Sequence, residues 1–150
     1  MNNLKDIQSF LQADQIAVAG VSRNPKKFGR EVFEELRKKG YNLIPLNPHT
    51  EEIAGVKCYK SVSDLPDGIQ HLYITTPKED TEKIVQEAVS KGIGNIWIQQ
   101  MSDTPEAVQF AEKNNINLIH KKCIFMFAEP VSGVHKFHRF LMKIFGLYPN

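Results

Sequence analysis

The hydrophobic positions of this chain fall into short apolar runs separated by longer amphipathic stretches. The runs are rich in small and β-branched residues and are too short for buried helices, so they predict strands buried on both faces of a sheet. The predicted strands cover residues 16–19, 42–46, 71–75, 96–98 and 117–120.

Between these runs, apolar residues recur at the one-turn spacing of amphipathic helices. Gly40 and Gly92 follow two of the helical stretches, and Thr104-Pro105 supplies an N-cap and a first-turn proline for another. We expect the first helix to pack on the edge of the sheet, and the last to cover the sheet or to join two subunits. Residues 51–62 have no periodicity and predict a loop with a short extended piece. The predicted helices cover residues 4–11, 29–39, 80–91, 105–114 and 133–146.

Strands that alternate with helices at this spacing predict parallel pairing through right-handed crossovers. We therefore expect an α/β fold, a three-layer, doubly wound, Rossmann-like parallel sheet of about five strands with an added C-terminal helix. The 150 residues form one predicted domain, 1–150, with a core at about residues 12–125. Ligands of such sheets bind at the carboxyl ends of the strands, where strand order reverses. Loops 20–29, 46–50, 75–78 and 99–102 should converge there.

The loop after the first strand has the features of a phosphate site. It begins at Gly20, carries Arg23, Lys26 and Lys27, and leads into a helix at Gly29. A helix N-terminus offers unpaired backbone N–H groups and positive partial charge, which favour an anion. A solvated, basic helix start is the alternative reading of the same residues.

The usual glycine fingerprint for dinucleotides is incomplete in this loop. Ser22 and Pro25 stand where the second and third glycines are needed, and the second strand ends in Leu46-Asn47-Pro48 without an acid for the adenosine ribose. NAD(P) is therefore disfavoured, although an NAD(P)-dependent oxidoreductase or redox sensor using the same cleft is kept as an alternative.

Three stretches in order carry a family resemblance: Gly20-Val21-Ser22-Arg23-Asn24-Pro25, then Ile44-Pro45-Leu46-Asn47-Pro48, then Ser63-Asp64-Leu65-Pro66. Together they resemble the small stand-alone CoA-binding proteins, which are similar to the nucleotide domain of the succinyl-CoA synthetase α subunit. The resemblance implies that the first loop holds CoA phosphates and that the end of the second strand meets the adenosine 3′-phosphate region. His49 stands where many relatives carry lysine.

The resemblance also implies that Thr75-Thr76-Pro77 lies along the adenine and that Gln99 walls the cleft. The expected ligand is coenzyme A or an acyl-CoA, bound by a non-catalytic carrier or sensor. The residues expected to contact it are Gly20, Val21, Ser22, Arg23, Asn24, Lys27, Phe28, Gly29, Asn47, Pro48, His49, Thr75, Thr76, Pro77 and Gln99.

Charge and composition argue against several classes of binding partner. A net charge of +2 lacks the basic surplus of most nucleic-acid binders, and no apolar run is long enough to span a membrane. The first residues lack a secretory signal pattern, so we expect a cytoplasmic protein. Cys58 and Cys123 predict reduced thiols, with Cys123 more typical of a buried hydrophobe than of a thiol that pairs with CoA.

The histidines and the C-terminal helix raise two further possibilities, a metal site and a protein interface. His120, His135 and His138 lack the supporting carboxylates of a zinc site, so no metal is predicted. The C-terminal helix has an apolar face formed by Val134, Phe137, Leu141, Ile144 and Phe145. It suggests a second alternative, a homodimeric interaction module without a nucleotide.

Overall fold

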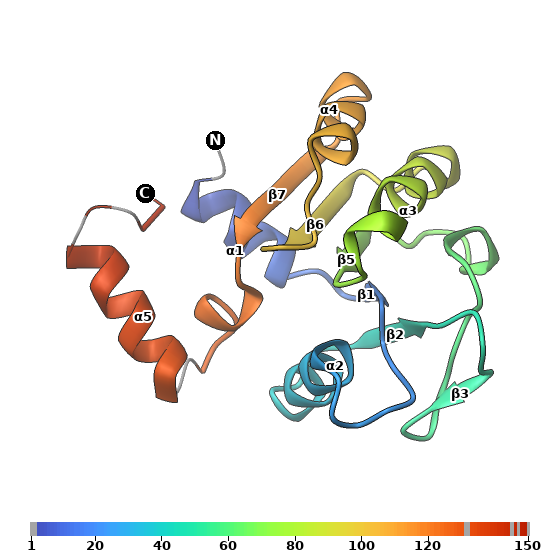
Figure 1. Cartoon of the computed structure of the whole chain (residues 1–150), viewed down its shortest axis with the longest axis horizontal. Coiled ribbons are helices and arrows are strands. Elements are labelled where there is room, and N and C mark those ends of the chain that lie inside the picture. Colours follow the sequence, from blue (N-terminus) through green and yellow to red (C-terminus); the bar gives the residue numbers. More distant parts are fainter. Residues whose placement is uncertain (1–2, 131–132, 145, 147, 150) are drawn as a thin grey trace.

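A computed structural model of the chain describes residues 3–130, 133–144, 146 and 148–149. Apolar runs form strands and amphipathic stretches form helices in the predicted order (Figure 1). The elements are α1 (Leu4–Leu11), β1 (Ile16–Ala19), α2 (Phe28–Lys38), β2 (Leu43–Leu46), β3 (Glu52–Ile53), β4 (Val56–Lys57), η1 (Val62–Asp64), β5 (His71–Ile74), α3 (Lys78–Lys91), β6 (Asn95–Gln99), α4 (Pro105–Lys113), β7 (Asn117–Lys122), η2 (Ile124–Met126) and α5 (Gly133–Ile144).

The main sheet has five strands in the order β2-β1-β5-β6-β7, and every neighbouring pair is parallel. From β1 the chain builds β2 on one side and then crosses over to build β5 on the other. Strand order therefore reverses beside β1, which creates the switch point at which ligands of such sheets bind. The predicted doubly wound α/β fold is confirmed.

Side chains at alternate positions along the strands point to opposite faces of the sheet and belong to two separate hydrophobic cores. Val18, Tyr73 and Trp97 face the core that includes α1 and α2, whereas Ala19 and Ile98 face the core that includes α3 and α4. Strands buried on both faces need no polar side, which is why their sequences read as continuous apolar runs.

The first helix differs from its prediction, because α1 packs on a face of the sheet and not on its edge. Phe10 makes edge-on ring contacts with His71 of β5, at 5.4 Å, and with Trp97 of β6, at 5.6 Å. Ile7 and Phe10 are fully buried. Helix α2 alone leaves the half of this face formed by β5–β7 uncovered, and α1 covers that half.

Several boundaries also shift. Residues 51–62, predicted as a loop, contain the short antiparallel hairpin β3–β4, whose strands of two residues are too short to leave a periodic pattern. Helix α3 begins at Lys78, and β7 continues to Lys122.

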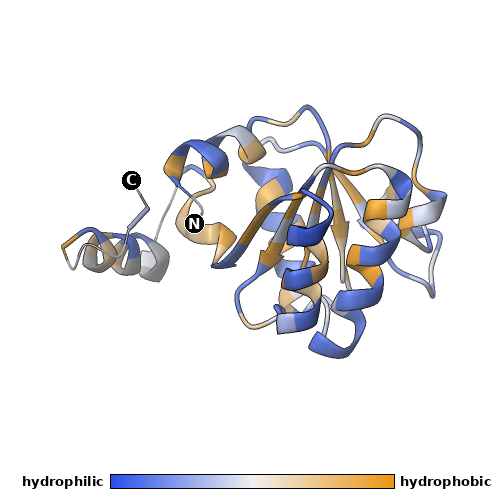
Figure 2. Cartoon of the chain, turned by 90° about the horizontal axis from the view of Figure 1, so that it is seen from above, coloured by the Kyte–Doolittle hydropathy of each residue, from blue (hydrophilic) through white to orange (hydrophobic). Residues whose placement is uncertain are grey.

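The C-terminal helix α5 lies outside the three layers (Figure 2). Phe137, Phe140 and Ile144 are exposed by 59, 57 and 60%. Met142 packs against the first core, but these three side chains stay in solvent, so the prediction that this helix covers the sheet is wrong. Phe145 and the side chains of Val134 and Leu141 lie outside the described residues. Among the residues that the structure describes, no helix is both long enough and apolar enough to cross a membrane.

Candidate functional site

Two adjoining cavities open at the carboxyl ends of the central strands, where the switch point lies. The β6 cavity, of about 630 Å³, lies beside the ends of β5 and β6. The β2 cavity, of about 460 Å³, lies beside the ends of β1 and β2. Gly20, Ser22, Thr76 and Pro77 line both. All four predicted loops therefore meet at one composite site.

Close backbone packing fixes the position of the loop between β1 and α2. Gly20 has a φ of +96°, and a Cβ on Gly29 would lie 2.0 Å from the Gly20 carbonyl oxygen. Only glycine at position 29 lets the first turn of α2 approach the end of β1 this closely. The helix N-terminus is thereby brought to the mouth of the β6 cavity, which Gly29 lines.

Side chains within the loop satisfy its own backbone. The Asn24 amide N–H donates to Ser22 Oγ at 3.0 Å, and the Lys26 N–H donates to Asn24 Oδ1 at 3.0 Å. The Lys27 side chain makes no capping bond to α2. Within the described part of the chain, the backbone N–H groups of Phe28 and Gly29 have no acceptor. Two free donors at a positive helix end can accept an anion as a hydrogen-bond partner.

The basic residues of the loop have different surroundings. Lys27 lines the β6 cavity, but Arg23 is exposed and lines neither cavity, nor does Asn24. Arg30, on the first turn of α2, bonds Glu34 at 2.6 Å and the Arg23 carbonyl oxygen at 3.3 Å. Arg30 therefore stabilises the loop through its backbone.

Asn47, predicted to contact ligand, lines the β2 cavity and also links two loops. Its Nδ2 donates to the Val21 carbonyl at 2.8 Å, and its Oδ1 accepts the His49 N–H at 2.8 Å. Both ends of the amide are thus engaged. The neighbouring Pro48 and His49 line the β2 cavity, as does Val21.

The segment after β5 forms the ridge between the cavities. The Thr75 N–H donates to the Ala19 carbonyl at 3.0 Å, which extends the pairing with β1 one residue past the end of β5. The Thr76 hydroxyl lies 3.2 Å from that of the buried Thr81. Thr76 and Pro77 therefore present a fixed edge to both cavities.

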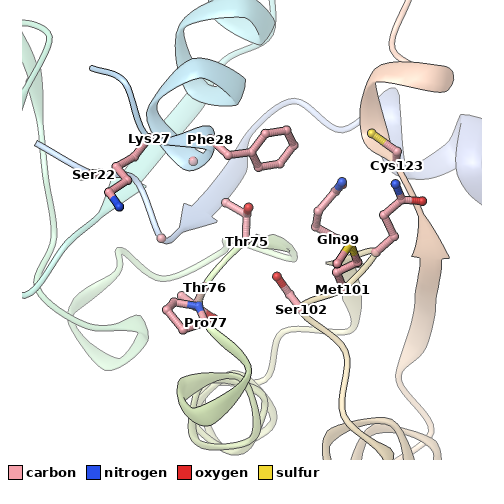
Figure 3. A pocket seen from close by; sticks show the side chains of 13 residues that line it. Ser22, Lys27, Phe28, Thr75, Thr76, Pro77, Gln99, Met101, Ser102 and Cys123 are labelled. Atoms are coloured by element: carbon pink, nitrogen blue, oxygen red, sulfur yellow. The ribbon is translucent and has the colours of Figure 1, made fainter. Parts of the chain in front are cut away.

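The far wall of the β6 cavity is formed by Gln99, Met101, Ser102 and Cys123 (Figure 3). Cys123 and Cys58 are both free and buried. Burial raises the pKa of the Cys58 thiol above its ordinary value, and a bond to the Asn47 carbonyl opposes this in part. Cys123 is buried, as expected for a small hydrophobic residue, but it also lines the cavity.

Several lining residues lie outside the predicted set. The β2 cavity is walled by cationic Lys60 and Lys83 and by acidic Asp80 and Glu87. Lys83 and both acids project from α3, and a helix that starts at the carboxyl end of β5 signals that its first turns face the site. Lys60 follows the β3–β4 hairpin, whose path leaves no sequence signal. The described residues include no group of three potential metal ligands, and the side chains of His135 and His138 lie outside them.

Comparison with known proteins identifies the family of this fold. The CoA binding domain family matches residues 14–129. The chain belongs to this family. It is 32% identical over 139 residues to the alpha subunit of acetate–CoA ligase [ADP-forming] II of Pyrococcus furiosus, covering 91% of this chain and 30% of that subunit. The chain thus spans less than a third of that relative.

Shorter relatives agree in length as well. The uncharacterized protein YneT of Bacillus subtilis is 28% identical over 120 residues, with 79% of this chain and 89% of YneT covered. A hypothetical protein from Pyrococcus horikoshii superimposes with a TM-score of 0.78 and 30% identity, covering 88% of this chain and 94% of the other. The family resemblance noted in the sequence is confirmed, together with the Rossmann-like fold.

Proposed function

We propose that this protein binds coenzyme A or an acyl-CoA across the two cavities and carries or senses it without transforming it. The observation that carries the proposal is the pair of free backbone N–H groups, of Phe28 and Gly29, in the wall of the β6 cavity of a CoA binding domain, in the same loop as Gly20 and Ser22, which line both cavities. They offer the pyrophosphate a neutral, fixed cradle that the helix dipole makes attractive to anions.

The proposed pose follows from the shape of the site. With the pyrophosphate at the loop of Ser22, Arg23 and Asn24, the adenosine enters the β2 cavity beside Pro48 and His49. The pantetheine arm then extends in the opposite direction along the β6 cavity. Arg23, exposed at the loop, would swing onto the phosphates, where a guanidinium adds charge-assisted hydrogen bonds.

The non-catalytic role is supported by the chemistry of the β6 cavity. Of its described lining residues, Lys27 and Cys123 are the ones with ionisable side chains. An acid–base pair within hydrogen-bond reach is the usual requirement for acyl or phosphoryl transfer, and these two do not provide one. Since CoA and its thioesters are abundant in the cytoplasm, a carrier or sensor fits the predicted cytoplasmic location.

Calorimetric titration with CoA, dephospho-CoA, NAD and NADP tests the proposal. We expect CoA to bind and Arg23→Ala to weaken it about tenfold, which corresponds to about 1.4 kcal/mol. Arg37→Ala is the matched control, because Arg37 lies at the other end of the same helix, bonded to the Ala54 carbonyl. Its affinity should equal that of the wild type.

The same titration decides between the alternatives. Heat from NAD or NADP and none from CoA would favour an oxidoreductase or redox sensor and overturn the proposal. If none of the four ligands gives a binding heat, the result would favour an interaction module that uses α5.

A further inference from the structure

The innermost wall of the β6 cavity contains a buried amide with one half unused. Gln99 ends β6, is only 5% exposed and lines the cavity. Its Oε1 accepts hydrogen bonds from the Tyr73 hydroxyl at 2.9 Å and from the Ile124 backbone N–H at 3.2 Å. A backbone N–H can only donate, so the atom that it meets must be the amide oxygen.

Tyr73 locks the amide in this orientation. Burial raises the pKa of Tyr73 well above its ordinary value, and the nearby Cys123 acts in the same direction. The phenol therefore stays protonated and remains a donor to Gln99. With the oxygen held twice, the Gln99 NH₂ group is left on the cavity side, and it has no acceptor among the described residues.

The groups around this donor are largely apolar. Phe28 stands over the cavity, 42% exposed, and packs edge-on against Phe125 at a ring distance of 6.0 Å. Met101 is 82% exposed, and the Cys123 thiol is buried beside them. Gln100 and Ser102 also line the cavity, but the wall around Gln99 is mostly apolar, and a fixed donor there suits a ligand group with one acceptor oxygen on a short hydrocarbon (Figure 3).

We infer that this wall recognises the acyl end of a thioester, with the Gln99 amide donating to the thioester carbonyl oxygen and Phe28 and Met101 enclosing the acyl chain. The inference rests on the proposed function and adds the ligand class: acyl-CoA in place of free CoA. Gln99 is thereby assigned as a specificity-determining residue.

Distance and energy both favour this assignment. In the sheet, β6 lies two strands from β1, about 10 Å at the usual strand spacing. The extended pantetheine arm is longer than this, so its end can reach Gln99 from a pyrophosphate at the loop. A ligand that covers the Gln99 NH₂ group without offering it an acceptor removes that group from water at a cost in free energy, so ligands with a carbonyl at this point are preferred over those without one.

The test compares acetyl-CoA with S-ethyl-CoA, which has a methylene in place of the carbonyl and otherwise keeps the two-carbon group. We expect the wild type to bind acetyl-CoA about fivefold to tenfold more tightly, the worth of one net hydrogen bond. In Gln99→Glu, which keeps an oxygen for Ile124 but loses the NH₂ donor, the ratio should fall to about one or invert. Gln109→Glu, an exposed position on α4, should keep the wild-type ratio.

The remaining outcomes distinguish a failure of this inference from a failure of the proposed function. Equal affinity of the wild type for acetyl-CoA and S-ethyl-CoA, with CoA also bound, would overturn the inference and leave CoA binding intact. An unchanged ratio in Gln99→Glu, with all three ligands weakened equally, would place the amide on a pantetheine carbonyl and overturn it as well. If Gln99→Glu does not fold, Gln99→Met removes the donor without adding charge and must also lose the discrimination. No binding of any CoA species would overturn the proposed function itself.

Discussion

Two glycines hold the site together at the residue scale. The Gly29 Cα approaches the Gly20 carbonyl so closely that no side chain fits between α2 and β1. This contact sets where the free N–H groups of the helix end point. The same contact makes position 29 the most sterically constrained glycine of the site.

Substitution of Gly29 by alanine should destabilise the protein by about 2 kcal/mol or more, because its Cβ would lie 2.0 Å from a backbone oxygen that cannot move freely. Urea unfolding gives the free energy. Gly94→Ala is the matched control, since the nearest atom to its Cβ would be the Gln70 Oε1 at 3.5 Å. A Gly29→Ala protein as stable as Gly94→Ala would show that the loop relaxes.

Lys60 and Lys83 bring positive charge to the β2 cavity, which His49 also lines. We expect Lys60→Ala with Lys83→Ala to reduce CoA affinity about tenfold and to leave dephospho-CoA nearly unaffected, because only CoA carries the 3′-phosphate. Titration of both ligands measures the change. Equal losses for the two ligands would assign the lysines to the pyrophosphate or to general attraction.

At the scale of elements, α1 shields His71 at the start of β5. The Phe10 ring covers the imidazole edge-on, and burial lowers the pKa of His71 below its ordinary value. The folded protein therefore takes up this proton at a lower pH than the unfolded chain does. The stabilisation is complete above an unfolded pKa of about 6.5 and is lost as the pH falls through it toward the folded value.

The packing of α1 thus predicts a pH dependence of stability. Between pH 7 and pH 5.5, the urea midpoint of the wild type should fall further than that of His71→Gln, which has no proton to take up. Unfolding curves of both proteins at the two pH values provide the comparison. Parallel losses in the two proteins would show that protonation of His71 does not oppose folding.

At the scale of the whole molecule, the site and α5 are separate. The two cavities are lined by residues between Ala19 and Cys123, whereas α5 presents Phe140 and Ile144 to solvent. Apolar side chains at this exposure are typical of a surface that pairs with another protein. The predicted homodimer through α5 is consistent with this exposure and remains to be tested.

If α5 joins two subunits, Phe140→Ser with Ile144→Ser should reduce the mass in solution from two chains to one. CoA affinity should not change, because neither side chain lines the two cavities. Light scattering after size-exclusion chromatography measures the mass. A wild type that is already monomeric at high concentration would exclude this dimer.

The sequence by itself determined the fold class and the location of the site. Parallel strands that are buried on both faces have continuous apolar sequences. The loop that begins at Gly20 is recognisable because a tight turn and a helix start each favour particular residues, glycine among them. Because these signals are local, the five strands and the four loops could be predicted without knowing what lies beside them. Family motifs along the same loops then pointed to CoA.

Tertiary structure alone decided which side chains face the two cavities. Arg23 and Asn24, expected at the phosphates, line neither cavity, whereas Asn47 lines the β2 cavity with both ends of its amide bonded to backbone groups. Lys60 and the free half of the Gln99 amide could not be predicted, because both depend on partners distant in sequence. Periodicity records how deeply a residue is buried, whereas its direction and its partners are set by strand order and by long-range packing.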